Sequence, residues 1–183
     1  MSETRIVITG FMGAGKTTVA RALARLLAAT YVSLDDLITQ HEGRTPQALI
    51  DEEGEGYFRD AETRALRRAL AAESALVIDT GGGAWTLARN RELIASDGCL
   101  AVWLDAPFEL CWQRITRDAP HAGRPLARDR AHAERLYEQR RVSYQLADLR
   151  VRVTPERSPE ELAAEIARRN SQKPDRERGR RRL

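Results

Sequence analysis

The sequence predicts an α/β fold, a three-layer α/β/α sandwich in which a parallel sheet of about five strands lies between helices. Short apolar runs alternate along the chain with longer segments whose apolar residues recur at helical spacing, and a glycine-rich loop joins the first run to the first helical segment. Such an alternation implies right-handed crossovers, which make the sheet parallel and cover both of its faces. At 183 residues the chain suits one compact domain, which we assign to residues 1–170.

The predicted strands are short apolar runs. β-branched residues dominate the first (TRIVIT), and the third and fourth (ALVID and CLAVWL) are almost wholly apolar, as expected for strands buried on both faces. Ligands of parallel sheets bind beyond the carboxyl ends of the strands, where the glycine loop, Asp35, Asp79 and Asp105 fall. In chain order the strands are expected at residues 4–9, 31–33, 75–79, 99–104 and 149–153.

Helices are predicted where apolar residues recur every three or four positions, as in KTTVARALARLLAA. Gly43 separates the second helix from the third, and the stretch Asp118–Arg124 breaks the chain after the sixth. In chain order the helices are expected at about 16–29, 35–42, 46–52, 55–72, 86–95, 107–117, 129–146 and 159–169.

Composition and charge lead us to expect a cytoplasmic protein. The formal net charge is +3, and much of the basic excess lies in residues 171–183, which we expect to be a disordered basic tail. No apolar run approaches the roughly 20 residues of a membrane-spanning helix, and the N-terminus lacks a secretion signal. Cys99 and Cys111 have no metal-ligand pattern around them and are expected as buried thiols, as Trp103 and Trp112 are expected in the core. We therefore expect no membrane or nucleic-acid partner, and a monomer, because no predicted helix carries a long unbroken apolar face.

The strongest motif is a phosphate-binding loop at residues 10–17 (GFMGAGKT), which matches G-x-x-x-x-G-K-[ST] between a strand and a helix. Its backbone N–H groups can face one anion, Lys16 would bridge the β- and γ-phosphates of ATP, and the Thr17 hydroxyl would bind Mg²⁺. A glycine-rich turn without a nucleotide is the alternative. Hydrolases, motors and switches share the motif, but a chain this short favours a small-molecule kinase. The residues expected at the nucleotide are Gly13, Ala14, Gly15, Lys16, Thr17 and Thr18.

Six motifs then carry a resemblance to a known family. From about Thr4 to Ile166 the chain contains, in order, GFMGAGKTT, Asp35-x-x-Ile38, GEGYFRDAE, GGGA, GRPL and QRRVSY. Their order and spacing resemble the shikimate kinase family. The resemblance implies a P-loop kinase that uses ATP and Mg²⁺ and transfers the γ-phosphoryl group to the 3-hydroxyl of shikimate.

By this resemblance Asp35 would hold the ring hydroxyls of the acceptor and act as base or orienter, while Arg59 and Arg140 would bind its carboxylate. An anionic acceptor suits the planar, permanently charged guanidinium group, and a hydroxyl nucleophile needs an acceptor for its proton. Gly81, Gly82 and Gly83 would let the backbone approach the ring. Other interpretations stay open: Asp35 only caps a helix, Arg59 is an exposed helix arginine, or Arg141 takes the place of Arg140.

On the nucleotide side the resemblance implies two further arginines. Arg124 would lie in a lid over about residues 118–128 and meet the charge of the transferring phosphoryl group, and Arg114 would lie against the adenine. The alternatives are an ordinary loop charge at Arg124 and a surface helix residue at Arg114. The catalytic residues expected are therefore Lys16, Asp35 and Arg124.

One position departs from the family's pattern. The family usually carries two aspartates, spaced D-x-D, after the second strand, and the first helps to hold magnesium, whereas here that position is Ser33. Asp79, at the end of the third strand, is the candidate that supplies the missing charge beside Thr17. The alternative is that Asp79 only accepts hydrogen bonds from the glycines that follow it.

Two other functions stay open on the sequence alone. The first is a kinase of the same fold that acts on another hydroxy acid or sugar, such as gluconate. The change at Ser33 would permit this, and so would Trp85, which follows the glycine triplet and either lines the pocket or packs in the core. The second is a nucleotide-dependent binding module whose basic tail contacts nucleic acid.

Overall fold

The structure is a computed structural model that describes residues 4–72, 75–122 and 129–172. Five parallel strands form one sheet in the order β2-β3-β1-β4-β5. The strands are β1 (Ile6–Thr9), β2 (Thr30–Ser33), β3 (Ala75–Asp79), β4 (Leu100–Asp105) and β5 (Leu149–Arg152). The predicted α/β class and the five-stranded parallel sheet are confirmed.

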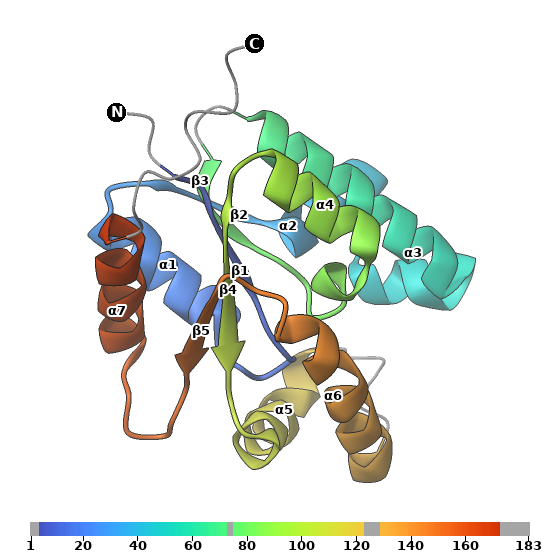
Figure 1. Cartoon of the computed structure of the whole chain (residues 1–183). Coiled ribbons are helices and arrows are strands. Elements are labelled where there is room, and N and C mark those ends of the chain that lie inside the picture. Colours follow the sequence, from blue (N-terminus) through green and yellow to red (C-terminus); the bar gives the residue numbers. More distant parts are fainter. Residues whose placement is uncertain (1–3, 73–74, 123–128, 173–183) are drawn as a thin grey trace.

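Helices cover both faces of this sheet. In Figure 1, α1 and α7 lie together against one face, α3 and α4 lie against the other, and α5 and α6 lie beyond the carboxyl ends of the central strands. None of the described helices is both long and apolar enough to cross a membrane. The helices are α1 (Lys16–Leu26), α2 (Leu34–Glu42), α3 (Pro46–Ala71), the 3₁₀ helix η1 (Ala84–Thr86), α4 (Ala88–Ser96), α5 (Phe108–Ala122), α6 (Arg130–Tyr144) and α7 (Pro159–Ser171).

The hydrophobic core is centred on β1 and β4, whose residues are all buried. This burial explains why the two runs lack an alternation of polar and apolar residues, because both faces of the strands are covered by helices. Trp103 is buried in β4, whereas Trp112 is only half-buried on α5 and stacks on Phe108. Both cysteines are buried free thiols, as expected.

The helices predicted at 46–52 and 55–72 are the two parts of α3, and they meet at a kink where Gly54 adopts a φ of 87°. Glycine tolerates this left-handed conformation, so the chain bends there and the helix resumes. Other boundaries differ from the prediction. The first helix ends at Leu26 rather than at residue 29, and α4 begins at Ala88, after the separate 3₁₀ helix η1. Helix α5 continues through Asp118 to Ala122, because turn-favouring residues lower helix propensity without always ending a helix. Arg124, most of the predicted lid and the tail from residue 173 lie outside the described residues.

Candidate active site

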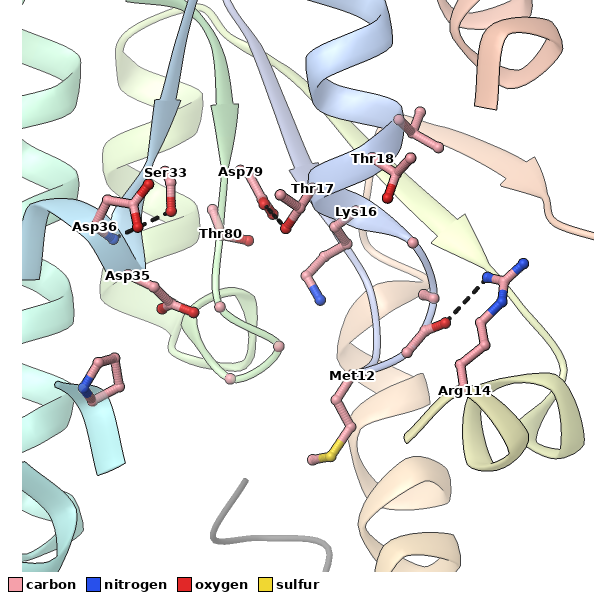
Figure 2. Close-up of a pocket in the computed structure, with 18 of the residues that line it drawn as sticks. Met12, Lys16, Thr17, Thr18, Ser33, Asp35, Asp36, Asp79, Thr80 and Arg114 are labelled. Carbon is pink, nitrogen blue, oxygen red and sulfur yellow. Dashed lines mark hydrogen bonds between the residues drawn. The ribbon is translucent and has the colours of Figure 1, made fainter. Parts of the chain in front are cut away.

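A cavity of about 1010 Å³ opens at the carboxyl ends of β1, β2 and β3. Its wall runs from the glycine loop before α1, past the loop after β3, to α3 (Figure 2). This volume is large enough for a nucleotide and a small second ligand. The residues expected to bind the nucleotide, the acceptor or the metal all line it where the structure describes them: Gly13, Ala14, Gly15, Lys16, Thr17, Thr18, Asp35, Arg59, Asp79, Gly81, Gly82, Gly83, Arg114 and Arg140.

The loop between β1 and α1 has the backbone of an anion site. Gly13 has a φ of 77°, and a methyl group there would come within 2.5 Å of the Cys111 carbonyl oxygen, so only glycine fits. Helix α1 begins at Lys16, and the unpaired N–H groups and partial positive charge of a helix N-terminus therefore lie at the cavity. Lys16 Nζ donates a 3.1 Å hydrogen bond across the loop to the Phe11 carbonyl. Such a loop can hold the phosphates of a nucleotide.

Asp79, the last residue of β3, lies directly beside Thr17 (Figure 2). Thr17 Oγ1 donates a 2.6 Å hydrogen bond to Asp79 Oδ2, and the Tyr31 hydroxyl reaches the same oxygen at 3.5 Å. Asp79 is 6% exposed, and its Oδ1 has no hydrogen-bond partner among the described residues. Burial raises the pKa of Asp79, and the charge of Lys16 opposes this rise. The hydrogen-bond partners of the carboxylate are therefore Thr17 of the phosphate loop and Tyr31 of β2, not the glycines that follow Asp79.

Ser33 ends β2 and serves as the N-cap of α2. Its Oγ accepts a 3.2 Å hydrogen bond from the N–H of Asp36. The alternative in which Asp35 is the cap is therefore wrong. Asp35 lies in the first turn of α2 and lines the cavity, where the N-terminus of the helix favours its negative charge (Figure 2).

At the α3 side of the cavity, the loop after β3 approaches two carboxylates. A methyl group on Gly81 would lie 2.7 Å from Glu62 Oε1 and 3.4 Å from Asp35 Oδ1. A side chain at Gly81 would therefore displace one or both carboxylates. The absence of a side chain at Gly81 leaves room for both carboxylates, and the backbone of the loop can therefore lie next to Asp35 and Glu62.

The next two glycines of this loop approach two guanidinium groups. A methyl group on Gly82 would lie 3.3 Å from Arg140 Nη1, and one on Gly83 would overlap the guanidinium of Arg59. Arg140 is 7% exposed and lines the cavity, whereas Arg141 is not among its described lining residues. Two arginines and two carboxylates thus surround one backbone turn, an arrangement suited to a small, hydroxylated anion.

Arg59 and Glu62 form a buried ion pair within α3. Arg59 Nη1 donates a 2.9 Å hydrogen bond to Glu62 Oε2, and Nη2 donates another of 2.9 Å to Glu55 Oε1. The Arg59 side chain is only 13% exposed, so it is not one more surface arginine. Burial raises the pKa of Glu62, and the charge of Arg59 opposes that rise. Burial also lowers the pKa of Arg140, although a guanidinium stays charged at neutral pH.

Glu62 and Tyr144 belong to this site but were not predicted from the sequence. Glu62 is fully buried on the stripe of α3 that also carries Phe58 and Leu66. A glutamate in the middle of an apolar stripe is the signal that reveals it, because an unpaired glutamate is almost never buried. Tyr144 is 1% exposed, and its hydroxyl donates a hydrogen bond to the Gly82 carbonyl. No local pattern reveals that contact, since 62 positions separate the two residues.

The remaining candidates divide between the cavity and the core. Arg114 Nη1 donates a 3.2 Å hydrogen bond to the Gly13 carbonyl and lines the cavity at the phosphate loop, so it is more than a surface residue (Figure 2). Asp105 instead binds Arg150, with a 2.7 Å hydrogen bond from Nε. Trp85 is buried, and its Nε1 donates a 2.8 Å hydrogen bond to a backbone carbonyl of α6. Neither Asp105 nor Trp85 is among the described residues that line the cavity.

The cavity has a phosphate loop at one end and a pocket with two arginines at the other, and it lies at the edge of a five-stranded parallel sheet. These features define the class of protein: a P-loop phosphotransferase with a small anionic acceptor. Comparison with known proteins identifies the family within this class. Residues 12–170 match the family model for shikimate kinase. The chain belongs to the shikimate kinase family.

Individual relatives agree with this assignment. The chain is 36% identical over 162 residues to a shikimate kinase of Persephonella marina, covering 88% of this chain and 95% of that protein. It is 38% identical to one from Lactococcus lactis, over 88% of this chain and 94% of that protein. The solved structure of shikimate kinase from Acinetobacter baumannii in complex with shikimate matches with a TM-score of 0.82 and 36% identity, covering 90% and 91% of the two chains.

Proposed function

We propose that this protein transfers the γ-phosphoryl group of ATP to the 3-hydroxyl of shikimate. The bond from the γ-phosphorus to the β–γ bridging oxygen breaks, a bond to the acceptor oxygen forms, and the hydroxyl proton leaves. The observation that supports this most is the shared cavity, which joins a phosphate loop to a pocket holding Asp35, Arg59 and Arg140. Catalysis of this kind rests mainly on positioning and charge neutralisation.

In the acceptor pocket, Asp35 would orient the attacking hydroxyl and accept its proton, while Arg59 and Arg140 would bind the acceptor carboxylate. Charged, forked hydrogen bonds fix both the position and the rotation of a carboxylate. Glu62 would hold Arg59 in place through their 2.9 Å hydrogen bond. The turn Gly81–Gly83 would border the ring with backbone, because side chains there would displace these groups.

At the nucleotide, Lys16 would contact the β- and γ-phosphates and Arg114 would lie beside the adenine. The Thr17 hydroxyl fits a magnesium ion, because its hydrogen is engaged by Asp79 and its lone pairs are left for a cation. Among the described residues no group of three His, Cys, Asp or Glu side chains gathers to hold a metal. The ion would therefore be shared with the phosphates, whose charge it neutralises when bound. The role of Arg124 stays a prediction from the sequence.

A coupled ADP-release assay with ATP and Mg²⁺ tests this function. We expect turnover with shikimate and only slow background with gluconate or with no acceptor. The variant Lys16→Ala serves as the control for contaminating kinases and should lose the shikimate-dependent rate. Equal rates with gluconate, or a rate of ATP hydrolysis that does not depend on shikimate, would contradict the proposed acceptor. Either result would still be compatible with ATP binding at the phosphate loop.

The basic tail has its own test, since nothing in the proposed reaction requires it. Removal of residues 171–183 should leave the shikimate-dependent rate unchanged. Loss of that rate in the truncated chain would assign the tail to the enzyme instead.

A further inference from the structure

We infer that Asp79 supplies, from β3, the carboxylate of the metal site beside the phosphate loop, and that position 33, its register partner on β2, can take over this role. The inference rests on the proposed function, in that the metal enters with the nucleotide. It concerns which strand provides the charge, which the phosphate-loop motif does not specify.

Sheet order places Asp79 closer to the loop than Ser33. Strand β3 lies between β2 and β1, and Asp79 is paired in register with Ile8 on one side and with Ser33 on the other. Because β1 leads directly into the phosphate loop, a residue on β3 is one strand nearer to it than a residue on β2. Asp79 makes direct contact with Thr17 from that place, at 2.6 Å.

The two oxygens of Asp79 are in different situations. Oδ2 accepts the Thr17 hydroxyl hydrogen, which orients the lone pairs of that hydroxyl away from the carboxylate. Oδ1 is buried and has no hydrogen-bond partner among the described residues, although the side chain lines the cavity. A buried carboxylate oxygen without a partner costs free energy, which a cation or one of its bound waters would offset. Oxygen ligands of this kind are those that Mg²⁺ prefers.

Ser33 cannot provide this charge in the native chain. Its side chain is neutral, and its Oγ already accepts the hydrogen bond that caps α2. Aspartate, however, caps helices as well as serine does. Strands in a sheet lie about 4.8 Å apart, so a carboxylate at position 33 would reach the same metal through a bound water. The register pair therefore offers two places for one charge.

The test measures Mn²⁺ binding to the full chain in the presence of ADP, by electron paramagnetic resonance of the free ion. Mn²⁺ takes the same oxygen ligands as Mg²⁺. Asp79→Asn keeps the size of the side chain and an acceptor for Thr17 but removes the charge. We expect it to weaken Mn²⁺ binding by about 10- to 100-fold, the usual effect of losing a group next to a metal ligand. Asp36→Asn removes a neighbouring carboxylate from the same cavity and should change the affinity by less than about twofold.

The double variant S33D/D79N tests the exchange between strands. We expect it to bind Mn²⁺ more tightly than D79N by at least about fivefold, because the charge is restored one strand away. Unchanged affinity in D79N would overturn the role of Asp79, and a double variant no tighter than D79N would overturn the exchange. Unfolding temperatures of all variants identify any that fail to fold. No acceptor is present in this measurement, so its outcome is independent of whether shikimate is the substrate.

Discussion

Arg59 and Glu62 lie one turn apart on α3 and are joined by a 2.9 Å hydrogen bond in a buried part of the cavity wall. Arg59 also binds Glu55, but the Glu55 side chain is 57% exposed. Arg59 thus has one buried partner, Glu62, and one exposed partner, Glu55, and each glutamate can be replaced separately. Comparing the two variants distinguishes a glutamate that holds Arg59 in position from a general effect of negative charge near it.

Glu62→Ala should raise the KM for shikimate by about 10-fold or more and leave the KM for ATP nearly unchanged. The buried carboxylate fixes the Arg59 guanidinium, and a loss of about 1.4 kcal/mol of binding corresponds to a factor of ten. Glu55→Ala removes the exposed partner and should change the KM for shikimate by less than about threefold. Steady-state kinetics with each substrate varied in turn provide both numbers. Equal effects of the two variants would contradict the positioning role of Glu62.

The stability of the protein should carry a pH dependence that Glu62 causes. Burial raises the pKa of Glu62 above its ordinary value of 4.5, so the folded protein holds this proton more tightly than the unfolded chain does. The stabilising contribution of the protonated form is therefore present below the ordinary pKa and is lost as the pH rises through the raised pKa. Glu62→Gln cannot titrate. In urea unfolding, the free energy of unfolding of the wild type minus that of Glu62→Gln should fall as the pH rises from about 4 to about 7. A difference that grows with pH would show that burial does not dominate.

Gly83→Ala should impair acceptor binding because its methyl group would overlap the Arg59 guanidinium. We expect the KM for shikimate to rise by at least about 10-fold, with ATP binding preserved. Gly56→Ala is the matched control on α3, since a methyl group there meets nothing within 4 Å. It should raise the free energy of unfolding by about 0.5–1 kcal/mol, because alanine favours a helix over glycine. Normal shikimate binding by Gly83→Ala would mean that Arg59 can move without cost.

Tyr144→Phe should loosen the turn that borders the acceptor. The Tyr144 hydroxyl, on α6, donates a hydrogen bond to the Gly82 carbonyl. Its removal leaves a partly buried acceptor without this partner, at a cost of about 1 kcal/mol. Tyr57→Phe is the control: its hydroxyl binds Glu42, but the residue is 38% exposed and should cost less than about 0.5 kcal/mol. For Tyr144→Phe, the free energy of unfolding measured in urea should fall and the KM for shikimate should rise. No change in either quantity would show that the turn holds its shape without this hydrogen bond.

The sequence predicted those parts of the fold and site that depend on local patterns. Apolar runs identified the five strands, and the phosphate motif placed Lys16 and Thr17 at the start of the first helix. Contacts between distant segments were harder to foresee. The contact of Asp79 with Thr17 depends on the pairing of β3 with β1, which no single segment encodes. The cap that Ser33 provides to α2 is, by contrast, a local contact with Asp36.

Burial was the other quantity that the sequence left undetermined. Arg59 is followed by several arginines, and only the packing of α3 shows that Arg59 faces the cavity with Glu62 beside it. In the same way, Trp85 lies only two residues after the last of the three glycines, yet it is buried in the core, where it donates a hydrogen bond to α6, and does not line the cavity. Which face of a helix or turn is covered depends on partners far along the chain.

The most direct test of the central claim is to follow the reaction of the wild-type protein with ATP, Mg²⁺ and shikimate by phosphorus nuclear magnetic resonance. We predict that ADP and one phosphomonoester form in equal amounts, and that the ester phosphorus is coupled to the proton on carbon 3 of the acceptor. Inorganic phosphate as the sole product, or an ester at another hydroxyl, would contradict the account.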